Sequence, residues 1–157
     1  MSFFDNAVII LLLIGVSCFF SMSEIALAAG RKIRLRQLSA EGDIRADKVL
    51  LLQEQPGNFF TVVQIGLNAV AIMGGIVGES AFTPHIHAFL SSWLDGPWLD
   101  KTSFLLSFAL VTSLFILIAD LIPKRLAMAF PEKVAMTFVG PMMVCIVVLK
   151  PLVWFFN

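Results

Sequence analysis

Charged residues are scarce in this sequence, and tyrosine is absent. Only 14% of the 157 residues are charged, and 11 Lys and Arg balance 11 Asp and Glu, so the formal net charge is zero. Because 59% of the residues are hydrophobic and the mean hydropathy is +0.92, the composition excludes a water-soluble enzyme fold. The lack of a basic excess also argues against a nucleic-acid partner, whose recognition requires a clustered basic face.

Cysteine is nearly absent as well. Cys18 and Cys145 lie in apolar surroundings without metal-type spacing, which indicates buried small hydrophobic residues rather than a disulfide or a zinc site. The sequence also lacks a Gly-rich phosphate loop, a nucleophile motif and a cluster of His and carboxylate metal ligands. We therefore expect that the protein is not an enzyme.

Three uncharged runs are long enough to cross a bilayer, which needs about 20 apolar residues. They contain 18, 24 and 18 residues and lie between Asp5 and Glu24, between Glu54 and Glu79, and between Lys101 and Asp120. These runs predict an all-α membrane protein with three transmembrane helices, at about residues 4–29, 57–80 and 102–122.

A fourth uncharged run, residues 134–149, has only 16 residues, contains Pro141 and is followed by Pro151. Its length favours an interfacial or re-entrant segment over a span, so we expect residues 131–157 to be juxtamembrane. The chain stops at Asn157 within an apolar stretch, and we expect a cytoplasmic part to follow it.

The basic residues predict the orientation. Residues 30–56 hold six of the eleven Lys and Arg, whereas residues 80–101 hold only Lys101. The positive-inside rule then places the amino terminus outside and residues 30–56 in the cytoplasm. Gly42 as a helix stop and Asp43 as an N-cap predict two short helices at about residues 31–54. Their basic residues could contact anionic lipid headgroups or could be ordinary positive-inside flanks.

Two carboxylates lie near the expected inner ends of spans, where a charge is costly without a partner or a function. The first is Glu24, and Ser21 precedes it by three residues, which is the spacing of a capping box that normally starts a helix. We therefore expect a break in the first span at this point. Unwound segments of this kind supply oxygen ligands to small cations in transporters.

The second carboxylate is Asp120, three residues before Pro123. Pro123 cannot donate a hydrogen bond to the carbonyl of Ala119, so an oxygen is freed beside a carboxylate. The Asp120 carboxylate and the freed carbonyl together require a positive group. That group is either a transported ion or the side chain of Lys124 or Arg125, reaching back from the interface. The sequence leaves this choice open.

The second span carries a polar and small-residue face. Gly74 and Gly78 have the spacing that allows two helices to approach closely. Gly66 could either break the helix or only reduce its width at that position. Gln64 and Asn68 lie one turn apart and should seek partners across the bundle. We expect them to share one inward-facing polar cavity with the two carboxylates.

Three ordered motifs resemble a known family. They are Phe19-Phe20-Ser21-Met22-Ser23-Glu24-Ile25-Ala26-Leu27, Phe59 through Gln64-Ile65-Gly66, and Asp120-Leu121-Ile122-Pro123-Lys124. Together they resemble the transmembrane domain of the CorC and cyclin M (CNNM) family, often labelled DUF21, and in particular its bacterial, hemolysin-like members. The resemblance covers essentially the whole chain, residues 1–157.

The resemblance implies a homodimer in the bacterial inner membrane, with three spans per subunit, a cytoplasmic pair of short helices and a belt-like juxtamembrane helix. Family members usually continue into cytoplasmic CBS domains that bind adenine nucleotide, and these are absent from this chain. Several members are implicated in magnesium efflux coupled to sodium entry. The implied partners are thus a second copy, membrane lipids, magnesium as substrate ion and sodium as possible coupling ion.

The resemblance also implies a site. Carried over by position, the ligands of the ion are Ser21, Ser23, Gly66, Leu67, Asn68 and Asp120, and the supporting residues are Glu24, Gln64, Ala119, Pro123 and Lys124. This chain has Gly66-Leu67 where many relatives have Gly-Asn, and Ala119-Asp120 where they have Gly-Glu. A shorter carboxylate and one amide fewer would enlarge the site or remove a ligand.

Three functions follow as hypotheses. The first is efflux of a cation, with magnesium as the expected substrate, through an inward-facing acidic cavity. The alternative is export of a polyamine or another organic polycation, which a wider acidic cavity suits better. The second alternative is a dimeric membrane anchor or regulator without transport, which the close-packing glycines and the basic helices would suit.

Overall fold

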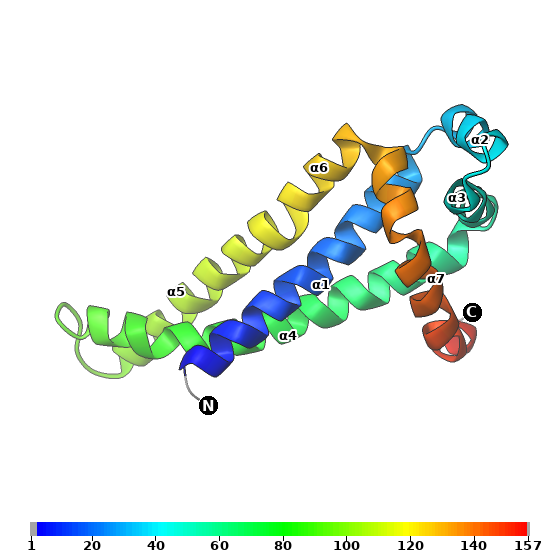
Figure 1. The fold of residues 1–157 in the computed structure, drawn as a ribbon. Helices are drawn as coiled ribbons and strands as arrows, with labels where there is room; N and C mark the ends of the chain where they lie inside the picture. The colour runs from blue at the N-terminus through cyan, green and yellow to red at the C-terminus, as the bar shows by residue number, and fades with distance from the viewer. Residues whose placement is uncertain (1–2, 157) are drawn as a thin grey trace.

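The computed structural model describes residues 3–156, and those residues form helices joined by short turns, with no strand among them (Figure 1). The all-α prediction is confirmed for this part of the chain; residues 1, 2 and 157 of the expected domain lie outside it. The elements are α1 (Phe3–Ala29), α2 (Lys32–Ala40), α3 (Ile44–Glu54), α4 (Pro56–Leu90), α5 (Pro97–Phe115), the π-helix η1 (Ile116–Leu121), α6 (Ile122–Ala129) and α7 (Pro131–Phe156).

Three long helices lie side by side: α1, α4 and the continuous helix made of α5, η1 and α6 (Figure 1). Each is long and apolar enough to cross a membrane, and each covers one of the three expected spans. Helix α4 runs beyond the expected end at residue 80 and reaches Leu90. Within this added length, Thr83 donates a hydrogen bond to the Glu79 carboxylate at 2.7 Å. The expected loop of residues 80–101 is therefore largely helical.

Helix α5 buries two serines and exposes several large apolar side chains. Ser103 and Ser107 are fully buried, whereas Phe104, Leu105 and Phe108 are exposed. Helix interfaces in membranes favour small residues because lipid is as apolar as a leucine side chain. The exposed side chains of α5 are thus suited to contact lipid.

The glycines of α4 let α5 approach closely. A β-carbon on Gly74 would lie 2.7 Å from the Phe115 ring, and one on Gly78 would overlap the Val111 side chain. The close-packing spacing found in the sequence is therefore used between two helices of the same chain. It no longer argues for a dimerising anchor.

Gly78→Ala is expected to destabilise the protein by about 1–3 kcal/mol, because the branched Val111 side chain is stiff and cannot move aside cheaply. Gly75→Ala, three residues earlier on the same helix, is the matched control, since nothing lies within 4 Å of its added β-carbon. Thermal unfolding in detergent measures both variants. Equal melting temperatures for the two variants would contradict this account of the packing.

Helix α1 is continuous through Ser21 and Glu24, so the expected break in the first span is wrong. The hydroxyl of Ser23 donates to the carbonyl of Phe19 at 2.7 Å, and that of Ser21 donates to Asp120 on another helix. Neither serine caps a helix start. The spacing of a capping box is also the spacing of one helical face, and here the second meaning applies.

Helix α4 is also continuous, across Gly66. A β-carbon added to Gly66 would lie 2.6 Å from the ring of Phe20, so the glycine makes room for that ring. Of the two alternatives left open by the sequence, a break at Gly66 is therefore wrong, and close packing of α1 on α4 explains the glycine.

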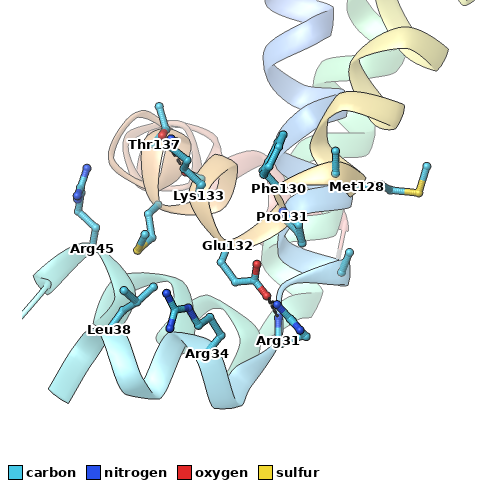
Figure 2. Close-up of a pocket in the computed structure, with 13 residues that line it drawn as sticks. Arg31, Arg34, Leu38, Arg45, Met128, Phe130, Pro131, Glu132, Lys133 and Thr137 are labelled. Carbon is cyan, nitrogen blue, oxygen red and sulfur yellow. Dashed lines mark hydrogen bonds and ion pairs between the residues drawn. The ribbon is translucent and has the colours of Figure 1, made fainter. Parts of the chain in front are cut away.

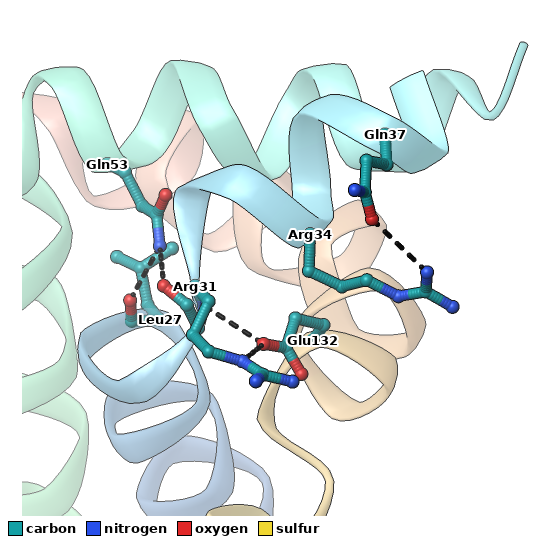
Figure 3. Close-up of polar contacts among 7 residues, drawn as sticks. Leu27, Arg31, Arg34, Gln37, Gln53 and Glu132 are labelled. Atoms are coloured by element: carbon teal, nitrogen blue, oxygen red, sulfur yellow. Dashed lines mark hydrogen bonds and ion pairs between the residues drawn. The ribbon is translucent and has the colours of Figure 1, made fainter. Parts of the chain in front are cut away.

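The short helices α2 and α3 occupy the segment for which two short helices are predicted. Gly42 has a φ of 95°, and the side chain of Asp43 accepts a hydrogen bond from the Arg45 amide at 3.0 Å. Figure 3 shows how α3 holds the end of α1: the Gln53 side-chain amide donates to the carbonyls of Leu27 at 3.0 Å and Gly30 at 2.9 Å. This contact satisfies carbonyls that the end of α1 leaves free.

Helix α7 is a fourth helix long and apolar enough to span a membrane, where only a juxtamembrane segment is expected. It continues through Pro141 and Pro151 without reversing, so the re-entrant alternative for residues 134–149 is wrong. In Figure 1 it crosses α1 and α4 near α2 and α3 rather than running alongside them. Its buried residues join the main hydrophobic core.

Candidate functional site

Two carboxylates and one ammonium group meet where α1 lies beside η1 and α6. The ammonium nitrogen of Lys124 is 3.0 Å from Oδ1 of Asp120 and 3.2 Å from Oε2 of Glu24. We refer to Glu24, Asp120 and Lys124 as the charge cluster. It joins Glu24 to two residues that lie about a hundred positions later in the sequence. The sequence predicts a partner or a function for each carboxylate, and a positive group beside Asp120.

One face of α1 provides its side of the site. Ser17, Ser21 and Glu24 are spaced by four and three residues, so they lie along a single stripe. Ser17 and Ser21 are buried, and the Glu24 side chain is 19% exposed. Ser17 was missed by the sequence analysis, although its spacing to Ser21 and Glu24 is the signal that could have found it.

The opposite side of the site is the π-helical turn η1. Pro123 has no N–H to donate to the carbonyl of Ala119, and the preceding amide, that of Ile122, bonds the carbonyl of Leu117 five residues back. The freed carbonyl of Ala119 accepts a hydrogen bond from the Ser17 hydroxyl at 3.2 Å. A serine of α1 therefore supplies a hydrogen-bond donor to the oxygen that Pro123 is predicted to free.

A serine fixes the position of Asp120. The Ser21 hydroxyl donates to Oδ1 of Asp120 at 2.6 Å, and this is the same oxygen that contacts Lys124. The second oxygen, Oδ2, has no hydrogen-bond or ion partner among the described residues. Because the side chain is 35% exposed, this oxygen is available to a further donor.

The charge cluster carries one negative charge more than positive charge. Two carboxylates face one ammonium, and the neighbouring Arg125 is exposed and pairs with neither carboxylate in the described structure. The buried Oε2 of Glu24 lies within ion-pair distance of Lys124 but has no aligned hydrogen-bond donor in the part of the chain that the structure describes. The cluster is therefore suited to bind an additional cation that donates hydrogen bonds.

The polar residues of the second span lie elsewhere. Gly66 faces α1, and positions 64 and 68 are each two residues away, about 200° around the helix. Gln64 and Asn68 are accordingly exposed, with no hydrogen bond among the described residues, and Leu67 is half-buried. The structure brings Ser21, Glu24, Asp120 and Lys124 together and does not bring the α4 amides to them.

The chemistry of the assembled groups is that of an amine site. Carboxylate and hydroxyl oxygens surround a primary alkylammonium group, which donates three hydrogen bonds. Within residues 3–156, no group of three or more His, Cys, Asp and Glu side chains could hold a metal ion. Of the sequence-derived ligands, Ser21 and Asp120 touch each other, whereas the hydroxyl of Ser23 bonds its own helix.

The chain matches a known family and several curated proteins. A family model described as the cyclin M transmembrane N-terminal domain matches residues 8–157. Polyamine export proteins are similar over nearly the whole chain. Those of Escherichia coli K12 and Salmonella typhimurium are each 58% identical over 153 residues, which cover 98% of this chain and 34% of the relative. That of Haemophilus influenzae is 50% identical over 157 residues, covering 100% of this chain and 36% of the relative.

The chain thus spans about a third of the length of these curated relatives. The four apolar helices and the family match together indicate a multi-pass inner membrane protein.

Proposed function

This chain belongs to the cyclin M transmembrane domain family, and from that premise we propose that it forms the membrane part of a polyamine exporter. The proposal selects the organic polycation that the sequence analysis kept as the alternative to magnesium. The similarity to polyamine export proteins supports it, and so does the chemistry of the charge cluster.

The observation that carries the proposal is the position of Lys124 between Glu24 and Asp120. A lysine side chain is an ammonium group on a four-carbon stem, which is the same chemistry as one end of a diaminobutane. A site that holds this group at 3.0 and 3.2 Å can hold the terminal ammonium of a polyamine in the same way.

We propose that substrate and Lys124 share or exchange this position during transport. An arriving ammonium would use the free Oδ2 of Asp120 and the buried Oε2 of Glu24, and the excess negative charge would favour its entry. Movement of Lys124 away from the carboxylates would complete the exchange. The basic segment of residues 30–56 supports a cytoplasmic location for this end of the bundle, with the amino terminus outside.

Magnesium, with sodium as coupling ion, is supported less well by the geometry. Magnesium requires near-octahedral coordination by oxygens at about 2.0–2.1 Å. Asn68 faces away from Asp120, and the backbone at Gly66 keeps its helical hydrogen bonding, so fewer of the expected oxygens converge. A role as a homodimer remains part of the proposal, although the glycines of α4 do not argue for it.

The proposal predicts selective flux. Proteoliposomes that contain the full-length protein should release radiolabelled putrescine or spermidine down a gradient, at least about tenfold faster than empty liposomes, since a specific path replaces diffusion of a charged molecule through hydrocarbon. Magnesium release, followed with a fluorescent indicator in the same preparation, should stay near the background. Release of magnesium without polyamine would support the first hypothesis of the sequence analysis, and release of neither would support a non-transporting regulator.

A further inference from the structure

A second site lies apart from the charge cluster, in a cavity of about 920 Å³ between the α2–α3 pair and the turn from α6 to α7. Figure 2 shows basic side chains of α2 and α3 facing Glu132 and Lys133 of α7 across this space. We propose that this cavity, which we call the basic pocket, binds the phosphate group of an anionic phospholipid.

Two of the four cations that line the pocket are already paired. Arg31 Nε is 2.9 Å from Oε1 of Glu132, which also accepts from the Arg31 amide at 3.0 Å (Figure 3). Arg45 contacts both oxygens of Asp43, at 3.1 and 2.9 Å. These hydrogen bonds from Arg45 lower the pKa of the Asp43 carboxyl, so this pair stays charged at neutral pH.

The other two cations, Arg34 and Lys133, have no acidic partner within residues 3–156. The guanidinium of Arg34 bonds only the amide oxygen of Gln37 at 3.3 Å, and the ammonium of Lys133 makes no ion pair among the described residues. A pocket that gathers two unpaired cations beside two satisfied pairs is complementary to an anion. Guanidinium groups in particular recognise phosphate oxygens through paired hydrogen bonds.

Apolar residues at the same pocket indicate a lipid rather than a free phosphate. Met128 and Phe130 line it, are 55% and 68% exposed, and lie where the membrane helix 97–129 ends. Met136 adds apolar surface from α7. A phosphate held by Arg34 and Lys133 would leave the glycerol and acyl chains beside these side chains, at the depth where headgroup and hydrocarbon meet.

The experiment measures binding of dioctanoyl phosphatidylglycerol to the purified full-length protein by native mass spectrometry. Binding should be about tenfold tighter than that of dioctanoyl phosphatidylcholine, because each cation at such a site attracts the anionic headgroup. The double variant Arg34→Gln/Lys133→Gln should weaken binding of phosphatidylglycerol by about the same factor. Arg36→Gln/Lys48→Gln is the matched control: both residues are exposed on α2 and α3, outside the pocket, and this variant should bind within about twofold of wild type.

Other results would overturn the proposal. Equal weakening in the two double variants would indicate diffuse surface attraction, and equal binding of both lipids would show that charge plays no part. Glycerol 1-phosphate or inorganic phosphate that displaces the lipid at the lipid's own concentration would identify a site for free phosphate instead. The charge-retaining variant Arg34→Lys/Lys133→Arg should keep most of the preference for the anionic lipid, which separates loss of charge from misfolding.

Discussion

Asp120→Asn is expected to lower polyamine export by the full-length protein at least about tenfold, because the loss of one charge-assisted contact in a partly dry site costs about 1.5–3 kcal/mol. The substitution keeps the shape of the side chain and its hydrogen bond from Ser21, but it leaves the charge cluster neutral. An arriving ammonium would then meet a single carboxylate, that of Glu24, whose charge Lys124 already balances. Flux of labelled putrescine from proteoliposomes measures the effect.

The two serines of α1 provide a matched pair of controls. Ser21→Ala should reduce export, since the Ser21 hydroxyl holds Asp120 at 2.6 Å. Ser23→Ala should leave export nearly unchanged, because the Ser23 hydroxyl bonds the Phe19 carbonyl of its own helix. An Asp120→Asn protein that exports at the wild-type rate would remove Asp120 from the substrate path, and equal effects of the two serines would contradict the assignment of Ser21.

The part of the site that depends on local chemistry could be predicted from the sequence. A proline removes one donor at a known position, so Pro123 alone predicts the free carbonyl of Ala119. The cost of a charge at membrane depth likewise predicts that Glu24 and Asp120 need a cation. These inferences require no knowledge of how the helices pack.

The identity of that cation depends on packing and could not be predicted. Lys124 and a transported ion would satisfy the same two carboxylates, and only the positions of α1 and α6 decide between them. The same limit applies to α4, where Gly66 faces α1 and thereby turns Gln64 and Asn68 away from the charge cluster. A spacing specifies which residues share a face but does not specify what the face contacts.

Patterns with two meanings account for the wrong predictions. The Ser21 to Glu24 spacing fits both a helix start and one face of an unbroken helix, and the long apolar context of α1 decides for the second. Prolines at positions 141 and 151 suggest a break, yet α7 continues through both, because the prolines remove only isolated hydrogen bonds from a helix of 26 residues.

Lys124→Ala is expected to destabilise the protein by about 1–3 kcal/mol, because it leaves two partly buried carboxylates without a cation. The cost is below that of a fully buried pair because the three side chains are 19–35% exposed. Arg125→Ala, at the next position, should change stability by less than about 0.5 kcal/mol, since Arg125 is exposed and forms no ion pair in the described structure.

Amines should restore the stability of the Lys124→Ala protein. Propylamine replaces the atoms that the substitution removes, and putrescine adds a second ammonium group that can use Oδ2 of Asp120. Both should raise the melting temperature of the variant more than that of wild type, in which Lys124 competes for the same carboxylates. Restoration by magnesium but not by either amine would instead identify the charge cluster as a metal site, and a variant as stable as wild type would show that Lys124 does not neutralise these carboxylates.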